Sequence, residues 1–230
     1  MIIDWSGHKW LTRERWGLIH PEKSYNWYDP SCTKVLNGIL NLDIKYNPKS
    51  FFIDNKQIHS LYGTGLVSCQ TDFGFGTFEI RAKLPKGKGL WPAFWLYPVN
   101  AWPPEIDVFE GYSGKRNYKT GCFLKPHDVE SCTHSKIGAW QPARKSWFWQ
   151  LSNPCENFNT YTLNWYADEL TFLINGKIIR SVTNKETLKE LADYKMQVII
   201  NNHIDGRFIN DFIAETPFII NYFSYKIKNY

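Results

Sequence analysis

The sequence has no long run of apolar residues. None of its segments approaches the ~20 consecutive apolar residues that a membrane-spanning helix needs. The N-terminal residues, Met1 to Trp5, lead directly into polar residues without the apolar h-region of a signal peptide. We therefore expect no association with a membrane and no signal peptide in this chain.

Cysteine is scarce and irregularly spaced. The cysteines are odd in number and follow no disulfide pattern; they are Cys32, Cys69, Cys122, Cys132 and Cys155. A zinc site could draw on Cys122, His127, Cys132 and His134, but their spacing fits no usual zinc finger and includes no C-x-x-C pair. We expect no metal ion and no cofactor in the chemistry, with this zinc set as the alternative.

The sequence also lacks a strong excess of either charge. Its 27 Lys and Arg against 22 Asp and Glu give a formal net charge of +5, which permits an anionic glycan as substrate without demanding one. The main case for nucleic acid is the stretch 125–159, where basic and aromatic residues are interleaved: Trp140, Arg144, Lys145, Trp147 and Trp149. The low net charge argues against that partner, and we expect a monomer that binds no nucleic acid.

Aromatic residues, in contrast, are abundant. Trp, Tyr and Phe make up 17% of the 230 residues. A β-sandwich core can hold many of them, and a carbohydrate-binding cleft is a second place for them because amphipathic rings stack on sugar faces. A chain of this length can form one all-β domain, so we expect a single domain over residues 1–230.

Three carboxylates fall within the six residues Glu105-Ile106-Asp107-Val108-Phe109-Glu110, and the residues between them are apolar strand formers. Successive side chains of a strand point to opposite faces, so Glu105 and Asp107 share one face and Ile106 and Val108 the other. Glu110 has the wrong parity to join the first two acids. One extra residue, a β-bulge, would bring it to their face.

Such a trio of acids suits a retaining glycosidase. In these enzymes one carboxylate attacks the anomeric carbon and another, about 5–5.5 Å away, protonates the leaving oxygen. A third acid between them raises the proton affinity of the acid/base and orients the nucleophile. Two other interpretations remain open at this point: an acidic strand face kept for solubility and a calcium site built from oxygen ligands.

The residues upstream of the acids carry a resemblance to a known family. The segment Phe75-Gly76-Thr77-Phe78-Glu79-Ile80-Arg81-Ala82-Lys83-Leu84-Pro85 leads to Gly89-Leu90-Trp91-Pro92-Ala93-Phe94-Trp95-Leu96, then to Trp102-Pro103 and the acids. This succession resembles glycoside hydrolase family 16, the laminarinase, agarase and carrageenase group, with the bulged motif E-x-D-x-x-E. The resemblance implies an all-β fold, a concanavalin A-like β-jelly-roll sandwich of two antiparallel sheets with one short helix.

The same resemblance implies an endo-acting retaining glycoside hydrolase that cleaves a β-linked polysaccharide, of β-1,3-glucan or β-galactan type, by double displacement. Glu105 would be the nucleophile, Glu110 the general acid/base and Asp107 the helper between them, in an extracellular or periplasmic enzyme. A non-catalytic glycan-binding protein on the same fold and a transglycosylase are the alternatives. Many relatives hold a structural calcium with an Asp near the position of Asn221, and the uncharged Asn argues against that ion here.

The resemblance also suggests substrate-binding candidates, which are Trp102, Glu79, Arg81, Trp91, Tyr97 and Asn201. Trp102 stands just before the acidic strand, where the matching family residue lies beside the scissile bond. Glu79 and Arg81 share one strand face, and the corresponding family positions border the cleft; a surface ion pair is the alternative. For Trp91 and Tyr97 the alternative is packing in the core.

Alternating or continuous apolar residues predict further strands, at about 40–46, 65–71, 77–84, 91–97, 112–124, 160–165, 170–174, 177–182, 196–201 and 218–228. Asn175-Gly176 predicts a type I′ hairpin turn, and a capping box that begins at Thr183 predicts a short helix through about Tyr194. Phe123 stands where many relatives present a His or Tyr to the cleft. The stretch 125–159 has little periodicity and predicts a loop that walls or covers one end of the cleft.

Overall fold

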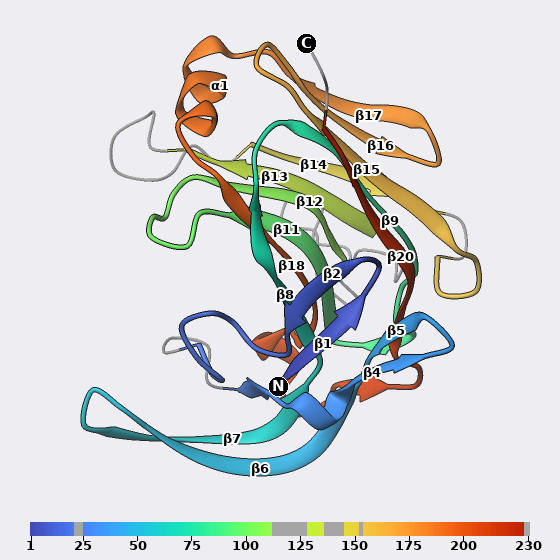
Figure 1. Ribbon diagram of the computed structural model, residues 1–230. Helices are drawn as coiled ribbons and strands as arrows, with labels where there is room; N and C mark the ends of the chain where they lie inside the picture. The colour runs from blue at the N-terminus through green and yellow to red at the C-terminus, as the bar shows by residue number, and fades with distance from the viewer. Residues whose placement is uncertain (21–24, 112–127, 136–144, 152–153, 228–230) are drawn as a thin grey trace.

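The computed structural model of the chain (Figure 1) consists mainly of β-strands. It describes residues 1–20, 25–111, 128–135, 145–151 and 154–227. Over these ranges the strands form an eight-stranded, a seven-stranded, a three-stranded and a two-stranded sheet. The expected all-β sandwich of two large antiparallel sheets is confirmed.

The eight-stranded sheet is antiparallel at every junction. In order across the sheet its strands are β1 (Ile2–Trp5), β2 (His8–Leu11), β8 (Leu66–Phe73), β18 (Met196–Ile204), β11 (Leu90–Tyr97), β12 (Glu105–Gly111), β13 (Asp128–His134) and β14 (Lys145–Gln150). β11 lies between β18 and β12, which agrees with the run of apolar residues that predicts a central strand for this segment.

The seven-stranded sheet is also antiparallel throughout. Its strands are, in order, β17 (Lys177–Val182), β16 (Leu170–Ile174), β15 (Asn159–Trp165), β9 (Gly76–Lys83), β20 (Phe218–Lys226), β5 (Ile39–Leu42) and β4 (Thr33–Leu36). The turn between β16 and β17 has positive φ at Asn175 (51°) and at Gly176 (76°), so the predicted type I′ hairpin is confirmed.

Smaller elements complete the described chain. The three-stranded sheet consists of β3 (Asn26–Tyr28), β7 (Lys56–Thr64) and β6 (Ile44–Ile53), and the two-stranded sheet of β10 (Gly87–Lys88) and β19 (Ile213–Ala214). The helices are α1 (Lys185–Ala192) and the 3₁₀ turns Pro30–Cys32 and Gly206–Phe208. None of these helices is long and apolar enough to cross a membrane.

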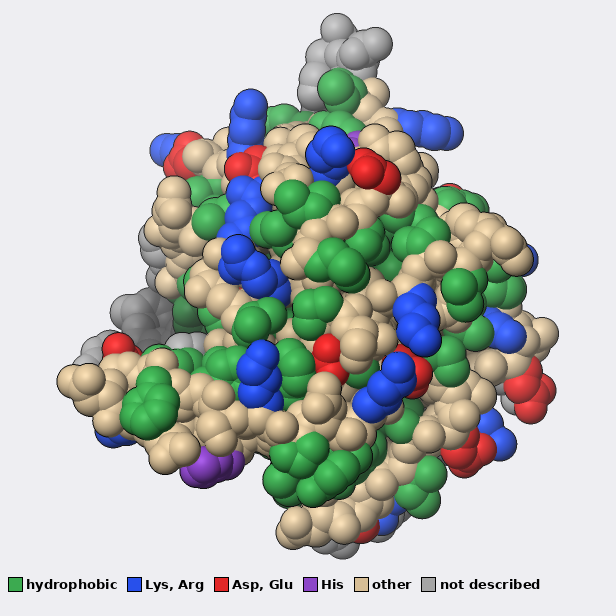
Figure 2. Space-filling model, turned by 60° about the horizontal axis from the view of Figure 1, so that its bottom comes forward, with side chains coloured by type: hydrophobic (Ala, Val, Ile, Leu, Met, Phe, Trp, Pro, Cys, Tyr) green, Lys and Arg blue, Asp and Glu red, His purple; other side chains and the backbone are tan. Residues whose placement is uncertain are grey.

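β6 and β7 form a long hairpin that extends beyond the two large sheets in Figure 1. Tyr46 and Phe52 on β6 and Leu61 on β7 are exposed. On the face that Figure 2 brings forward, hydrophobic side chains are interspersed with lysine and arginine side chains.

The main core lies between the two large sheets. β12 contributes Ile106, Val108 and Phe109, all almost fully buried. The ring of Phe109 lies 4.3 Å from that of Tyr161 and 6.1 Å from that of Phe218, both in the seven-stranded sheet. Each such buried side chain contributes roughly 1.5–3 kcal/mol, so one face of β12 is firmly anchored and its other face is free to carry polar groups.

Three local predictions are corrected. The predicted strand 40–46 is divided at Asp43, whose backbone N–H and C=O bond instead to Cys32 and Gly65.

The helix begins one residue later than predicted, because Asn184 rather than Thr183 caps it by accepting from the Thr187 N–H. It ends at Ala192. The stretch 125–159 is not one long loop, since it contains β13 and β14. The predicted strand 112–124, with Phe123, lies outside the described residues.

Candidate active site

A β-bulge in β12 gathers the three acids on one face. On β11, Trp95 pairs with Asp107 and the adjacent Phe94 pairs with Phe109, so Val108 is the extra residue. The pairing with β13 shifts in the same interval. After the bulge the parity is reversed, because Phe109 enters the core and Glu110 points to the side of Glu105 and Asp107. We call this side of the eight-stranded sheet, which is turned away from the core, the acid-bearing face.

Two tryptophan indoles fix the two glutamates. The Trp102 Nε1–H donates to Glu105 Oε2 at 2.8 Å, and the Trp91 Nε1–H donates to Glu110 Oε1 at 3.0 Å. Glu110 is 8% exposed, whereas the Trp102 side chain is 56% exposed. A charge-assisted hydrogen bond from a fixed ring restricts the carboxylate to a narrow range of orientations. Trp91 and Trp102, predicted as substrate contacts, therefore also orient the acids.

A histidine from the neighbouring strand lies against the first two acids. His134 pairs with Glu105 across the β12–β13 ladder, and its Nε2 lies 3.5 Å from Glu105 Oε1 and 3.2 Å from Asp107 Oδ2. Burial lowers the pKa of the His134 imidazole. The hydrogen bond with Cys132 and the negative charges of Glu105 and Glu110 outweigh that effect, and the pKa lies above its ordinary 6.5.

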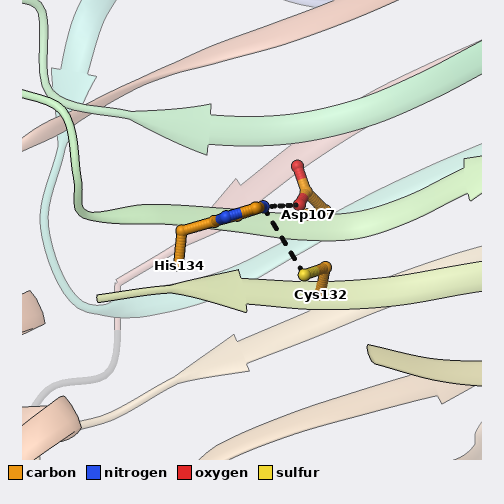
Figure 3. Close-up of side chains that lie close together, drawn as sticks. All are labelled: Asp107, Cys132 and His134. Carbon is orange, nitrogen blue, oxygen red and sulfur yellow. Dashed lines mark hydrogen bonds and ion pairs between the residues drawn. The ribbon is translucent and has the colours of Figure 1, made fainter. Parts of the chain in front are cut away.

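Cys132 completes this group of side chains. It pairs with Asp107, and the register therefore directs its side chain to the acid-bearing face. Its Sγ lies 3.5 Å from His134 Nε2. Figure 3 shows Asp107, Cys132 and His134 converging from two adjacent strands. The Cys and the His belonged to the zinc set considered from the sequence, whereas Cys122 and His127 lie outside the described residues.

Asn201 and Tyr97 support the acid-bearing face from β18 and β11. Asn201 is 2% exposed; its Oδ1 accepts from the Trp95 indole at 2.7 Å, and its Nδ2 donates to the Trp91 carbonyl. The ring of Tyr97 stacks on that of Trp95 at 5.0 Å. Both residues were predicted as substrate contacts, but their polar atoms bond within the protein, so they hold the tryptophans in place.

Glu14 is a member of this region that the sequence did not reveal. The hydroxyl of Tyr97 donates to its Oε2 at 3.3 Å and accepts from the Trp16 indole at 3.1 Å. Glu14 is 1% exposed. Burial raises the pKa of Glu14 to about 8; the Tyr97 hydrogen bond opposes this rise and the charge of Glu105 adds to it. Glu14 lies in an aperiodic segment, so neither parity nor spacing could have identified it.

Glu79 and Arg81 do not lie near the acids, and their prediction as cleft residues is wrong. They belong to β9 of the seven-stranded sheet, while Phe78 and Ile80 on the same strand fill the core. Glu79 accepts hydrogen bonds from Thr162 and Tyr222, and the Arg81 guanidinium lies 4.4 Å from the Phe158 ring. Their shared strand face was predicted correctly, but it is the outer face of the opposite sheet.

His134 could have been found from the sequence. Cys132 and His134 are two residues apart, which places them on one face of a strand. The strand itself was missed because the alternate positions Ser131 and Thr133 are polar although both are buried. Arg180 reaches across from β17 and donates to both hydroxyls, at 3.4 and 2.9 Å. The inner side of β13 is thus polar at these two positions, and the hydrophobic pattern of a strand is interrupted.

Comparisons with known proteins agree with this architecture. The endo-1,3-1,4-beta-glycanase ExsH of Rhizobium meliloti (strain 1021) is 31% identical over 226 residues, which cover 93% of this chain and 43% of the relative. The chain therefore spans less than half the length of that relative.

Solved structures show the same fold. A structure reported with endo-acting O-glycanases of the human gut microbiota has a TM-score of 0.78 at 24% identity, covering 97% of this chain and 86% of that one. The catalytic domain of an endo-1,3-beta-glucanase (laminarinase) from Thermotoga petrophila RKU-1 has a TM-score of 0.69 at 22% identity, covering 89% and 84%. The model of glycosyl hydrolases family 16 matches residues 23–209. The chain belongs to this family.

Proposed function

We propose that this chain is an endo-acting, retaining glycoside hydrolase that cleaves a β-linked polysaccharide, with a β-1,3- or mixed-linkage β-glucan as the first substrate to test. The observation that carries the proposal is the bulge at Val108, which presents Glu105, Asp107 and Glu110 on one face. The similarity to an endo-1,3-1,4-beta-glycanase over most of the chain supports the choice of glucan. A β-galactan is the next substrate class to test. Because polysaccharides of this kind lie outside the cytoplasm, we place the site of action there as well.

In the first step, a carboxylate oxygen of Glu105 attacks the anomeric carbon from the face opposite the leaving group. As the glycosidic bond breaks, the carboxylic acid of Glu110 gives its proton to the departing oxygen, and a glycosyl ester of Glu105 remains. Trp102 holds Glu105 from one side through its indole N–H, and its exposed ring offers a surface on which a sugar can stack.

In the second step, the Glu110 carboxylate takes a proton from a water molecule while the water oxygen attacks the anomeric carbon. The ester bond to Glu105 breaks, and the configuration is retained after two inversions. The Trp91 indole holds Glu110 in both steps. Asp107 lies between the two glutamates, and its contact with His134 keeps its carboxylate fixed beside the nucleophile.

The test begins with purified polysaccharides: laminarin, a mixed-linkage β-glucan and a β-galactan. We expect new reducing ends and intermediate-length oligosaccharides from at least one of them. Products longer than the starting oligosaccharide would indicate transfer in place of hydrolysis. Binding without new reducing ends would indicate a glycan-binding protein and would contradict the proposal.

The two glutamates can be told apart by their variants. Glu105→Gln should abolish turnover while glycan binding remains, and Glu110→Gln should lower kcat about 10²–10⁴-fold on unactivated substrate. With an aryl glycoside and azide, Glu105→Ala should yield the α-glycosyl azide, because azide displaces the leaving group once. Glu110→Ala should yield the β-glycosyl azide, because azide attacks the ester on Glu105. Turnover by Glu105→Gln at the wild-type rate would refute the assignment.

A further inference from the structure

Two carboxylates and one thiol converge on a single ring nitrogen at the acid-bearing face. Asp107 Oδ2, Glu105 Oε1 and Cys132 Sγ lie 3.2, 3.5 and 3.5 Å from His134 Nε2. A ring nitrogen carries one hydrogen or one lone pair, so it cannot form three good hydrogen bonds at once. A cation placed between these four groups could contact all of them.

The three distances from His134 Nε2 match edges of a tetrahedral zinc site. With Zn–N of 2.0–2.1 Å and Zn–S of 2.3 Å, tetrahedral ligands lie about 3.4 Å apart for an N–O pair and about 3.6 Å apart for an N–S pair. The three distances from His134 Nε2 fall within about 0.2 Å of these values. The ligand atoms of Asp107, Cys132 and His134 all lie within 4.8 Å of one another, and side-chain rotations would bring the three edges that do not include His134 to similar lengths.

We propose that Glu105, Asp107, Cys132 and His134 form a site for a borderline divalent cation of the Zn²⁺ class, and that its occupation blocks hydrolysis. Thiolate and imidazole ligands select Zn²⁺ or Co²⁺ over Ca²⁺ and Mg²⁺. The block rests on the proposed function, because the ion would engage the nucleophile Glu105 and its helper Asp107 together. Binding releases the Cys132 thiol proton to solvent.

The site has a route to solvent and a defined shape. Asp107 and Cys132 are 3% and 0% exposed and form its floor, while the side chains of Glu105 and His134 retain 16% and 15% exposure. An ion would therefore enter between Glu105 and His134. The ladder pairs Asp107 with Cys132 and Glu105 with His134, so the backbone of two adjacent strands fixes all four positions before any ion arrives.

The binding test uses Co²⁺ as the probe and the full chain with its thiols reduced. We expect a thiolate-to-cobalt charge-transfer band that saturates at about one equivalent and disappears when Zn²⁺ is added, as a tetrahedral site predicts. Cys132→Ser should abolish the band. The matched control Cys155→Ser, which removes a partly buried thiol outside the cluster, should keep it. Circular dichroism establishes that each variant is folded. A wild-type protein without the band, or a band that survives in Cys132→Ser, overturns the site.

The functional arm measures hydrolysis of the best glycan with and without Zn²⁺. Wild-type activity should fall with Zn²⁺, recover with a chelator, and stay constant with Ca²⁺ or Mg²⁺. When the activity of Cys132→Ser is normalised to its value without Zn²⁺, half inhibition should need at least about 100-fold more Zn²⁺ than in the wild type. The reason is that even a residue that only supports a metal ligand contributes about 10–100-fold to metal affinity. Unchanged hydrolysis at saturating Zn²⁺ overturns the block. If the chain cleaves no glycan, that result contradicts the proposed function but not the metal site, because the cobalt titration tests the metal site independently.

Discussion

Glu14 makes the stability of this protein depend on pH in a way that can be measured. Its pKa is raised from an ordinary 4.5 to about 8, first by burial. Below pH 4.5 the carboxyl group is protonated in both the folded and the unfolded chain. As the pH rises above 4.5 the unfolded chain ionises, while the folded chain keeps its proton until about pH 8. The free energy of unfolding therefore falls over this window and becomes level above it.

The size of the effect follows from the linkage relation. Each unit of difference in pKa is worth about 1.36 kcal/mol, so the full shift corresponds to roughly 5 kcal/mol between pH 4 and pH 9. Glu14→Gln removes the titration and keeps an oxygen that can accept from Tyr97, its present donor. Between pH 5 and pH 8 the stability of the wild type should therefore fall by about 4 kcal/mol relative to the variant.

Urea denaturation at pH 5, 6, 7 and 8 measures this difference. Groups that do not interact with Glu14 titrate alike in the two proteins, and their contributions cancel in the subtraction. Glu156→Gln, the same change at an exposed position, is the matched control and should give a much smaller pH-dependent difference. A difference curve for Glu14→Gln that stays flat from pH 5 to pH 8, or that rises with pH, would show that Glu14 is not buried with a raised pKa.

Two further substitutions test contacts of single side chains. Trp102→Phe keeps an aromatic ring but removes the N–H that Glu105 Oε2 accepts at 2.8 Å, so kcat should fall about tenfold or more with KM little changed. Trp102→Ala should raise KM as well, and a Phe variant with the wild-type kcat would contradict the orienting role. Arg180→Met deprives Ser131 and Thr133 of their donor and should lower the free energy of unfolding by about 2–3 kcal/mol. Adding Ser131→Ala and Thr133→Val should recover much of that loss; an unchanged urea midpoint for Arg180→Met would refute the argument.

The acidic strand could be predicted from the sequence because parity and burial constrain it together. Ile106 and Val108 are apolar and were expected to face the core, which places Glu105 and Asp107 on the other side. One extra residue in the strand was the smallest change that would bring Glu110 to the same face as these two acids. The Asn175-Gly176 pair predicted the hairpin turn between β16 and β17, and the same alternation predicted β9 and β15. In each case one face of a strand is apolar and the other polar, so the period of two is visible.

The errors arose where long-range contacts replace that pattern. β13 was missed because Arg180, almost fifty residues away in sequence, provides hydrogen bonds for a buried polar face. Glu79 and Arg81 were assigned to the wrong sheet, because parity defines a face of a strand but not the sheet to which the strand belongs. Glu14 accepts a hydrogen bond from Tyr97, which lies far away in the chain and gave no local signal.

Because of the bulge at Val108, the number of residues between Asp107 and Glu110 in the sequence does not determine the distance between them along the sheet. Measured on β13, Asp107 and Glu110 lie opposite Cys132 and Glu130, only two residues apart. If Val108 were deleted, plain alternation would still direct all three carboxylates to the same side, with Phe109 inward and a similar span along the partner strand. Loss of this residue is therefore compatible with the same placement of the three carboxylates, and it removes the packing of one valine from the core.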